Sequence, residues 1–170
     1  ILVSHSWLYE LHPLTWLGFS WISSFIISIS ILLGCSMVGG ILVYLWGLLG
    51  KRILQRKDIS NMNSLTLAVK VLLLSFAWGI GEFILSQTSL FWIGLGEGIV
   101  PGDLYLAGLA KWIGASGLCV VQLIIGFWIY LIYEKWKRKY HLKKTFLFGL
   151  LILVLLHFFG GFLCTFFLSR

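Results

Sequence analysis

The acidic residue with the most unusual surroundings in this sequence is Glu82, which lies in the apolar run AWGIGEFIL. An ionisable group inside an apolar span is costly, so such a group usually faces a cavity or a partner. Two roles therefore stay open for Glu82: it anchors a neighbouring helix, or it faces a substrate. Trp78 precedes it by four residues, so the two side chains share one face of a helix and can line the same wall.

No catalytic residue is predicted in this chain. A nucleophile needs a neighbouring base and a third group that orients the base. The sequence has no G-x-S-x-G elbow, no phosphate-binding loop and no H-E-x-x-H helix. Cys35, Cys119 and Cys164 all fall in apolar runs without C-x-x-C spacing, so we interpret them as small buried hydrophobic residues. We predict neither a metal site nor a cofactor.

The histidines are interpreted as structural residues. His5 and His12 flank Glu10 near the N-terminus, but their spacing matches no recognised metal site. Trp and Tyr residues surround them, which is typical of side chains that anchor a helix end at a membrane interface. His157 lies alone in the last apolar run, where a hydrogen-bonded packing role is the expected one.

Composition places these residues in a membrane protein. Of the 170 residues, 59% are apolar and only 11% are charged, whereas an average globular domain carries roughly 25% charged residues. A water-facing surface would need more polar side chains than the chain has. Four runs reach the length of about 20 apolar residues that crosses a bilayer. They predict an all-α transmembrane bundle, with spans at about residues 20–49, 65–86, 112–133 and 145–168. Residues 1–8 are interpreted as the end of an earlier, truncated span.

The basic residues predict the orientation of these spans. Ten of the 13 Lys and Arg residues fall in two short segments beside apolar runs, which argues for membrane topology and against nucleic-acid binding. By the positive-inside rule, loops 50–64 and 134–144 are cytoplasmic. Loop 87–111 and the C-terminus then face outward.

The outward segment 87–110 is too apolar for an ordinary loop in water. It reads QTSLFWIGLGEGIVPGDLYLAGLA, rich in Gly and interrupted by Pro101. Non-helical backbone at membrane depth is tolerated only where protein buries it or where it lines a cavity. We therefore predict a partly embedded loop that lines a cavity open to lipid.

Three stretches of the chain resemble the membrane region of apolipoprotein N-acyltransferases. They are SHSWLYELHPLTWLG from Ser4, WGIGEF from Trp78, and FWIGLGEGIVPGDLYLAGLAKWIGASGL from Phe91. WGIGEF is similar to a W-x-x-x-E-F helix of that family, and the third stretch to its outward loop and next span. The chain departs from the family just after the E-F pair, where the Ile84-Leu85-Ser86 stretch replaces an Arg that is often found there. It departs again in the loop, where the family's G-F-P-W and Y-S-Q elements appear here as Leu90-Phe91-Trp92 and Gly96-Glu97-Gly98.

The resemblance implies acyl transfer at the outer face of the inner membrane, from a phospholipid to the α-amino group of a lipoprotein's lipidated N-terminal cysteine. It implies a Cys nucleophile activated by a Glu and a Lys in a nitrilase-like domain that this chain lacks, so this piece alone is expected to be inactive. Its implied partners are therefore phospholipid and lipoprotein, not nucleic acid, and the implied role is to seat the catalytic domain and shape a lipid-accessible cavity. The predicted substrate-binding residues are Trp78, Glu82, Phe83, Trp92, Glu97 and Asp103.

One alternative from another class stays open. A stand-alone membrane scaffold or a transporter subunit would use Glu82 as a polar relay. Transporters of this kind often have repeated halves and helices broken at mid-depth, and the sequence indicates neither. Its polar residues gather at the outer edge of the spans instead.

Overall fold

The computed structural model describes residues 9–10, 12–54, 64–88, 94–99, 102–139 and 141–168. Within these ranges the chain forms helices and no strand. The elements in chain order are η2 (Leu14–Leu17), α1 (Trp21–Leu54), α2 (Ser64–Ser86), η3 (Glu97–Ile99), α3 (Leu104–Ala107), α4 (Ala110–Lys137) and α5 (Lys143–Leu168).

Four of these helices, α1, α2, α4 and α5, are long and apolar enough to cross a membrane. This confirms the predicted fold class for the described part of the chain. Residues 1–8, interpreted above as the end of an earlier span, lie outside the described residues. The 34 residues of α1 would measure ~51 Å at ~1.5 Å per residue, which exceeds the hydrocarbon thickness of ~30 Å. This helix therefore has to tilt or to extend into the interface.

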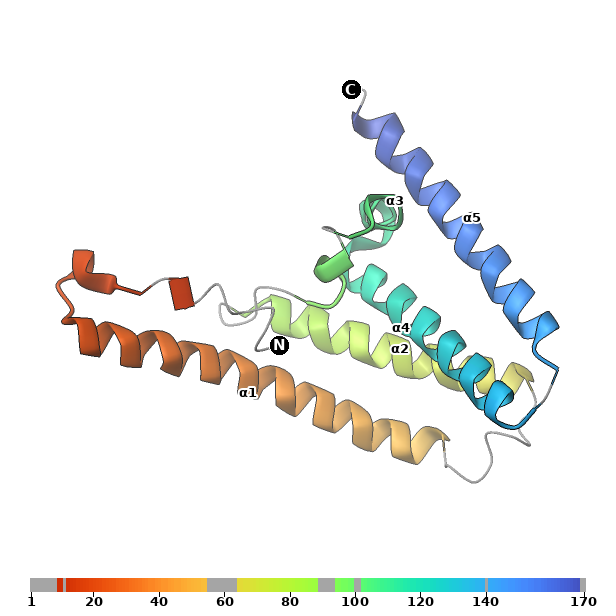
Figure 1. Cartoon of the computed structure of the whole chain (residues 1–170), viewed down its shortest axis with the longest axis horizontal. Helices are drawn as coiled ribbons and strands as arrows, with labels where there is room; N and C mark the ends of the chain where they lie inside the picture. The colour runs from red at the N-terminus through yellow and green to blue at the C-terminus, as the bar shows by residue number, and fades with distance from the viewer. Residues whose placement is uncertain are drawn as a thin grey trace.

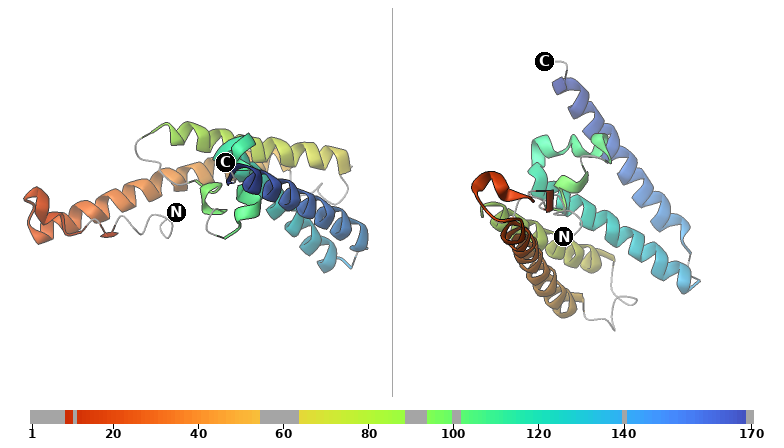
Figure 2. Two further views of the ribbon diagram at one scale, coloured as in Figure 1. Left: turned by 90° about the horizontal axis from the view of Figure 1, so that it is seen from above. Right: turned by 60° about the vertical axis from the view of Figure 1, so that its left-hand side comes forward.

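The helices form an open arrangement. In Figure 1, α1 and α2 run side by side, α4 crosses α2, and α5 diverges from α4 with distance from their connection. The right-hand view of Figure 2 shows the same divergence, with α3 beside α5. Helix α3 packs mainly against α5 and also touches α4. Through α3, the segment between α2 and α4 therefore contacts both of the diverging helices, α4 and α5.

A small buried core lies where this segment meets the spans. It is formed by Leu106 of α3, Leu109, Leu118 of α4 and Leu163 of α5. Many apolar side chains elsewhere on the long helices are exposed, as expected for helices whose solvent is lipid. The core therefore holds the segment between α2 and α4 onto the bundle, and its partial embedding in the membrane stays a prediction.

Two glycine features allow this packing. Gly114 has a φ of 68° inside α4 and interrupts its helical backbone, a conformation that residues with a side chain rarely adopt. Gly108 and Gly160 lie where α3 meets α5. A Cβ on Gly108 would overlap the carbonyl of Gly160, and one on Gly160 would overlap the carbonyl of Tyr105. Close backbone contact of this kind is how small residues join helices in membranes.

The N-terminal segment is fixed to the start of α1. The hydroxyl of Ser24 is hydrogen-bonded to His12 Nδ1 at 2.8 Å and accepts the backbone N–H of Leu14 at 2.6 Å. The rings of Trp21 and Phe25 pack edge-on against His12. His12 thus has a packing position, in line with its structural interpretation, while His5 lies outside the described residues.

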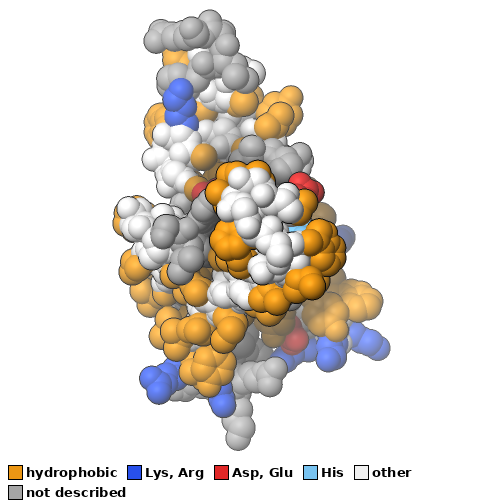
Figure 3. Space-filling model, turned by 90° about the vertical axis from the view of Figure 1, so that its left-hand side faces the viewer, with side chains coloured by type: hydrophobic (Ala, Val, Ile, Leu, Met, Phe, Trp, Pro, Cys, Tyr) orange, Lys and Arg blue, Asp and Glu red, His pale blue; other side chains and the backbone are white. Residues whose placement is uncertain are grey.

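The basic helix ends collect on one side of the molecule. Lys51 and Arg52 end α1, Lys135 and Lys137 end α4, and α5 starts with Lys143. These ends lie toward the right in Figure 1, away from α3. On the face drawn in Figure 3, most Lys and Arg side chains lie at the lower end, below a wide apolar surface. The bundle therefore has one basic end and one end that carries the segment between α2 and α4.

Candidate functional site

Glu82 on α2 is buried and bound to the segment that follows this helix. Only 4% of the surface of this residue is exposed. The carboxylate accepts the backbone N–H of Leu95 through Oε1 at 2.7 Å. A Cβ on Gly94 would lie 3.0 Å from Oε2, so the loop backbone lies directly over the carboxylate. Glu82 therefore holds the loop onto α2 through this hydrogen bond.

Trp78 lies one turn before Glu82 and is buried as well. Its ring meets the ring of Trp46 on α1 edge to face, with centroids 5.5 Å apart. Trp46 Nε1 in turn donates to the carbonyl of Leu74 at 2.8 Å. Cys119 on α4 is fully buried, and a Cβ on Gly79, the residue after Trp78, would lie 2.8 Å from the side chain of Val120 on the same helix α4. Trp78 and Glu82 thus share one wall, and α1, α2, α4 and the loop all meet there.

Gly96 brings the loop backbone against α4. A Cβ at this position would overlap the carbonyl of Ala115 and would lie 3.1 Å from the backbone nitrogen of Cys119. Only a residue without a side chain fits in this space without moving the loop or the helix. The loop is therefore seated between the carboxylate of Glu82 on one side and the backbone of α4 on the other.

Glu97 acts within the loop itself. This exposed residue accepts the backbone N–H of Gly94 through Oε2 at 2.8 Å. The bond closes a short turn that leads into η3. Glu97 thus shapes the loop without reaching the helices through this bond.

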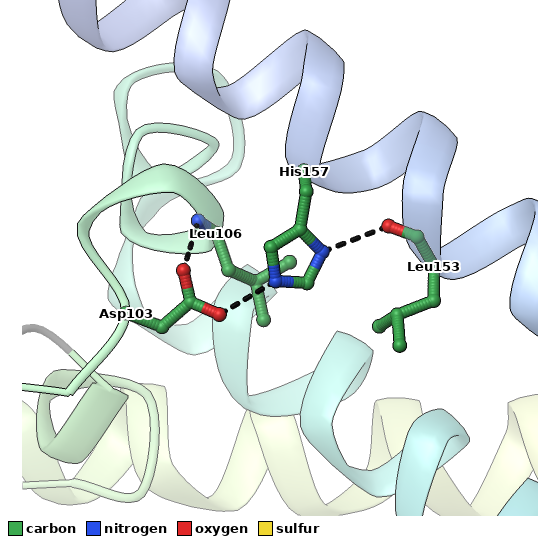
Figure 4. Close-up of polar contacts among 4 residues, drawn as sticks. All are labelled: Asp103, Leu106, Leu153 and His157. Atoms are coloured by element: carbon green, nitrogen blue, oxygen red, sulfur yellow. Dashed lines mark hydrogen bonds and ion pairs between the residues drawn. The ribbon is translucent and has the colours of Figure 1, made fainter.

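Asp103 links the loop to α5 (Figure 4). Its Oδ1 accepts the N–H of Leu106 at 2.9 Å and caps the short helix α3. Its Oδ2 lies 2.6 Å from Nε2 of His157. Nδ1 of His157 lies 2.8 Å from the carbonyl of Leu153, which can only accept. Both ring nitrogens therefore face acceptors, and both bonds form together when the ring carries two protons or the carboxyl group carries one.

The surroundings of Asp103 favour its charged form. The hydrogen bond from the N–H of Leu106 holds the pKa of this carboxyl group below its ordinary value, and the contact with His157 acts in the same direction. Burial acts against both but does not overcome them. Asp103 is therefore a carboxylate near neutral pH. Its partner His157 lies one turn before Gly160, the residue at which α3 contacts α5.

The predicted site residues thus separate into groups. Trp78 and Glu82 lie together under the loop, whereas Glu97 and Asp103 are bonded to other parts of the same loop. Phe83 is 57% exposed and does not share the burial of this cluster. Trp92 lies outside the described residues. The three acids share one property: each accepts a backbone N–H from the segment 94–106.

Sequence reasoning missed three members of this arrangement. The contact of Gly96 with the backbone of Cys119 on α4 forms only in the folded chain, and the sequence carries no signal for it. The pairing of Asp103 with His157 joins residues 54 positions apart. The capping by Asp103 did have a signal, since Asp is a favoured residue just before a helix. Among the residues that the structure describes, no three His, Cys, Asp or Glu side chains gather as a metal ion would require.

The four long apolar helices define a multi-pass helical membrane protein. Its curated relatives are named apolipoprotein N-acyltransferase, which confirms the resemblance noted in the sequence. The relative from Prochlorococcus marinus subsp. pastoris (strain CCMP1986 / NIES-2087 / MED4) is 89% identical over 161 residues, which is 95% of this chain. Relatives from Prochlorococcus marinus strains MIT 9313 and SARG / CCMP1375 are 42% and 40% identical, each over 94% of the chain.

The similarity covers only part of these relatives. The chain spans 32% of the length of each of the three. No family model matches the chain. No solved structure matches it either.

Proposed function

We propose that this chain is the membrane portion of an apolipoprotein N-acyltransferase. The whole enzyme transfers an acyl chain from a phospholipid to the α-amino group of a lipoprotein's lipidated N-terminal cysteine, a step of lipoprotein maturation. The support is the identity of 89% over nearly the full chain to a relative of that name, together with four helices suited to a membrane. The phospholipid acyl donor and the lipoprotein are the proposed partners.

The chemistry of that reaction belongs to residues outside this chain. The resemblance implies a Cys nucleophile in a nitrilase-like domain, and the relatives are about three times as long as the part matched here. Cys119 is fully buried between α2 and α4, so no substrate reaches its thiol in this arrangement. We propose that the chain contributes no catalytic residue and is inactive alone.

We propose that its role is to hold the segment 94–109 in place beside the catalytic domain and to shape a lipid-accessible cavity there. The observation that carries this role is the hydrogen bond from Leu95 to the buried carboxylate of Glu82. A polar relay would need that carboxylate to face a water path. Here the loop backbone covers the carboxylate, which favours positioning over relay.

The location proposed is the bacterial inner membrane, with the basic loops 50–64 and 134–144 in the cytoplasm. Loop 87–111 and the C-terminus then face outward. The described basic helix ends lie on one side of the bundle and the segment 94–109 lies on the other, an asymmetry that supports this orientation by the positive-inside rule.

The test compares two substitutions at Glu82 in the full-length protein. Glu82→Gln keeps an oxygen that accepts the N–H of Leu95, whereas Glu82→Ala removes it. We expect Glu82→Ala to lose most N-acylation and Glu82→Gln to keep most of it. The measurement is the mass of the N-terminal lipopeptide of a reporter lipoprotein, in cells whose own acyltransferase is depleted. Glu134→Ala is the matched control, because it removes an acid at the basic end of the bundle, away from the loop.

Each outcome of this test decides between the roles. Equal loss in Glu82→Gln and Glu82→Ala, with normal amounts of protein in the membrane, would favour a relay that needs the charge. Full N-acylation in Glu82→Ala would remove Glu82 from the site. Absence of N-acylation by the unsubstituted full-length protein would reject the proposed function itself.

A further inference from the structure

A large groove lies at the basic end of the bundle, opposite the segment that Glu82 holds. It has a volume of about 1050 Å³ and is bounded by α2, α4 and α5. This volume lies just above the range of roughly 300–1,000 Å³ that small-molecule sites occupy. Apolar side chains form most of its wall, among them Val71, Ile125, Trp128, Ile152 and Leu156.

Charged side chains occur at only one end of this groove. Lys135 and Arg138 reach it from the end of α4, and Lys144 from the start of α5. Lys135 Nζ donates to Thr145 Oγ1 at 2.5 Å, so this side chain extends from α4 to α5 at the rim of the groove. Arg138 forms an ion pair with Glu134 at 3.4 Å, and Glu134 also lines the groove. Three cations and one anion leave this rim with a net charge of +2.

The length of the groove matches one leaflet of a bilayer. Along α5 it extends from Lys144 to Leu156, a separation of about 18 Å at ~1.5 Å per residue. Half of the hydrocarbon core measures ~15 Å. A molecule whose charged group lies at the rim can therefore lay its acyl chain along the apolar wall without leaving its leaflet.

We propose that this groove binds an anionic phospholipid of the leaflet at the basic end of the bundle. The phosphate lies among Lys135, Arg138 and Lys144, and an acyl chain lies between α4 and α5. Basic pockets between transmembrane helices on the cytoplasmic side select anionic headgroups in this way. An apolar helix would bring no anion to Lys135 and Lys144 of the rim, which favours an anionic lipid over another span as the occupant. This site lies at the opposite end from the acyl-transfer region, so it is independent of the proposed function.

The test measures lipid binding by the purified full-length protein in detergent, using native mass spectrometry. Phosphatidylglycerol and phosphatidylcholine with identical chains are titrated separately. The groove variant is Lys135→Gln with Lys144→Gln, which leaves the Arg138–Glu134 pair in place. The matched control is Lys137→Gln with Lys143→Gln, which removes the same charge from the same two helices at residues that do not line the groove.

We expect phosphatidylglycerol to bind the groove variant about 25-fold more weakly than the unsubstituted protein, since the variant lacks two basic groups and each contributes about a factor of five near an anionic lipid. The control variant should bind phosphatidylglycerol less than threefold more weakly. The affinity for phosphatidylcholine should be the same in the unsubstituted protein and in both double variants. Equal weakening in both double variants would mean general surface attraction and would overturn the proposal. Tight binding of phosphatidylcholine to the unsubstituted protein would overturn it too.

A second variant tests the apolar wall and does not depend on charge. Ala68 on α2 lines the groove and is exposed, so Ala68→Trp fills part of the acyl-chain space. We expect this variant to lose phosphatidylglycerol binding while the Lys side chains remain. Retention of binding in Ala68→Trp, or cross-linking of a Cys placed at Ile152 to another helix of the full-length protein, would show that a lipid does not occupy the groove.

Discussion

Comparing two substitutions of Asp103, one to Ala and one to Asn, separates the contributions of the two bonds that this side chain makes. Asp103→Ala removes the acceptor for the N–H of Leu106 and the contact with His157. Loss of a helix N-cap costs about 0.5–2 kcal/mol. Both partners of the Asp103–His157 pair have side chains that are 34% exposed, so the pair contributes only about 0.2–1 kcal/mol. We expect Asp103→Ala to lower the free energy of opening the α3 segment by about 1–3 kcal/mol.

Asp103→Asn should cost less, because its oxygen still accepts from Leu106 and only the charge is lost. The expected cost is below about 1 kcal/mol, the contribution of the ion pair. Amide hydrogen exchange of residues 103–109 measures local opening in the full-length protein. The Ala variant should exchange about 5- to 150-fold faster there, and the Asn variant less than about fivefold faster. Equal acceleration by Ala and Asn would refute the view that the cap is the larger contribution.

The same carboxylate predicts a pH dependence. Its pKa is below the ordinary value because Leu106 and His157 stabilise the charged form. A lowered folded-state pKa gives stability that is fully present above the unfolded value of about 3.9 and is lost as pH falls through the folded value. Exchange at residues 103–109, corrected for the intrinsic rate, should therefore be constant from about pH 5 to 6 and rise below about pH 4. In Asp103→Ala this rise should be absent.

Two further predictions concern glycines at backbone contacts. Gly96→Ala should destabilise the seated loop by about 1–3 kcal/mol and reduce N-acylation, because its Cβ meets the α4 backbone; Gly98→Ala, which meets nothing within 4 Å, should change neither. Gly160→Ala should lower the thermal unfolding midpoint of the purified protein, because its Cβ would separate α3 from α5. The control is Gly126→Ala, whose Cβ would meet nothing within 4 Å, and it should leave the midpoint unchanged or raise it. A larger effect from either control than from its partner would contradict these backbone contacts.

The helices could be predicted from the sequence because a membrane imposes a simple requirement. A span needs about 20 apolar residues, and the runs that meet it are visible without tertiary knowledge. The limits of a helix are less visible. Helix α1 continues to Leu54, beyond the predicted limit near residue 49, because Lys51 and Arg52 end an apolar run without ending a helix. The interruption of α4 at Gly114 has no sequence signature that separates it from a glycine used for packing.

The candidate site was predictable only where its members share one element. Trp78 and Glu82 lie one turn apart, so their common face followed from helix periodicity, and both are buried. The partners of the acids come from the loop and from another helix. Leu95 is 13 residues from Glu82, and His157 is 54 from Asp103. Such contacts depend on how the helices cross, which periodicity does not encode.

The acids of this site have a physical reason to bind backbone. A non-helical segment at membrane depth must find hydrogen-bond partners for its N–H groups, since lipid supplies none. Glu82, Glu97 and Asp103 each accept one such N–H. Carboxylates that hold the loop in this way have less capacity to select a substrate. Under the proposed function, we therefore expect exposed apolar side chains such as Phe83 to contact the acyl chains. Phe83→Ala should then alter the acyl-chain preference while the loop stays in place.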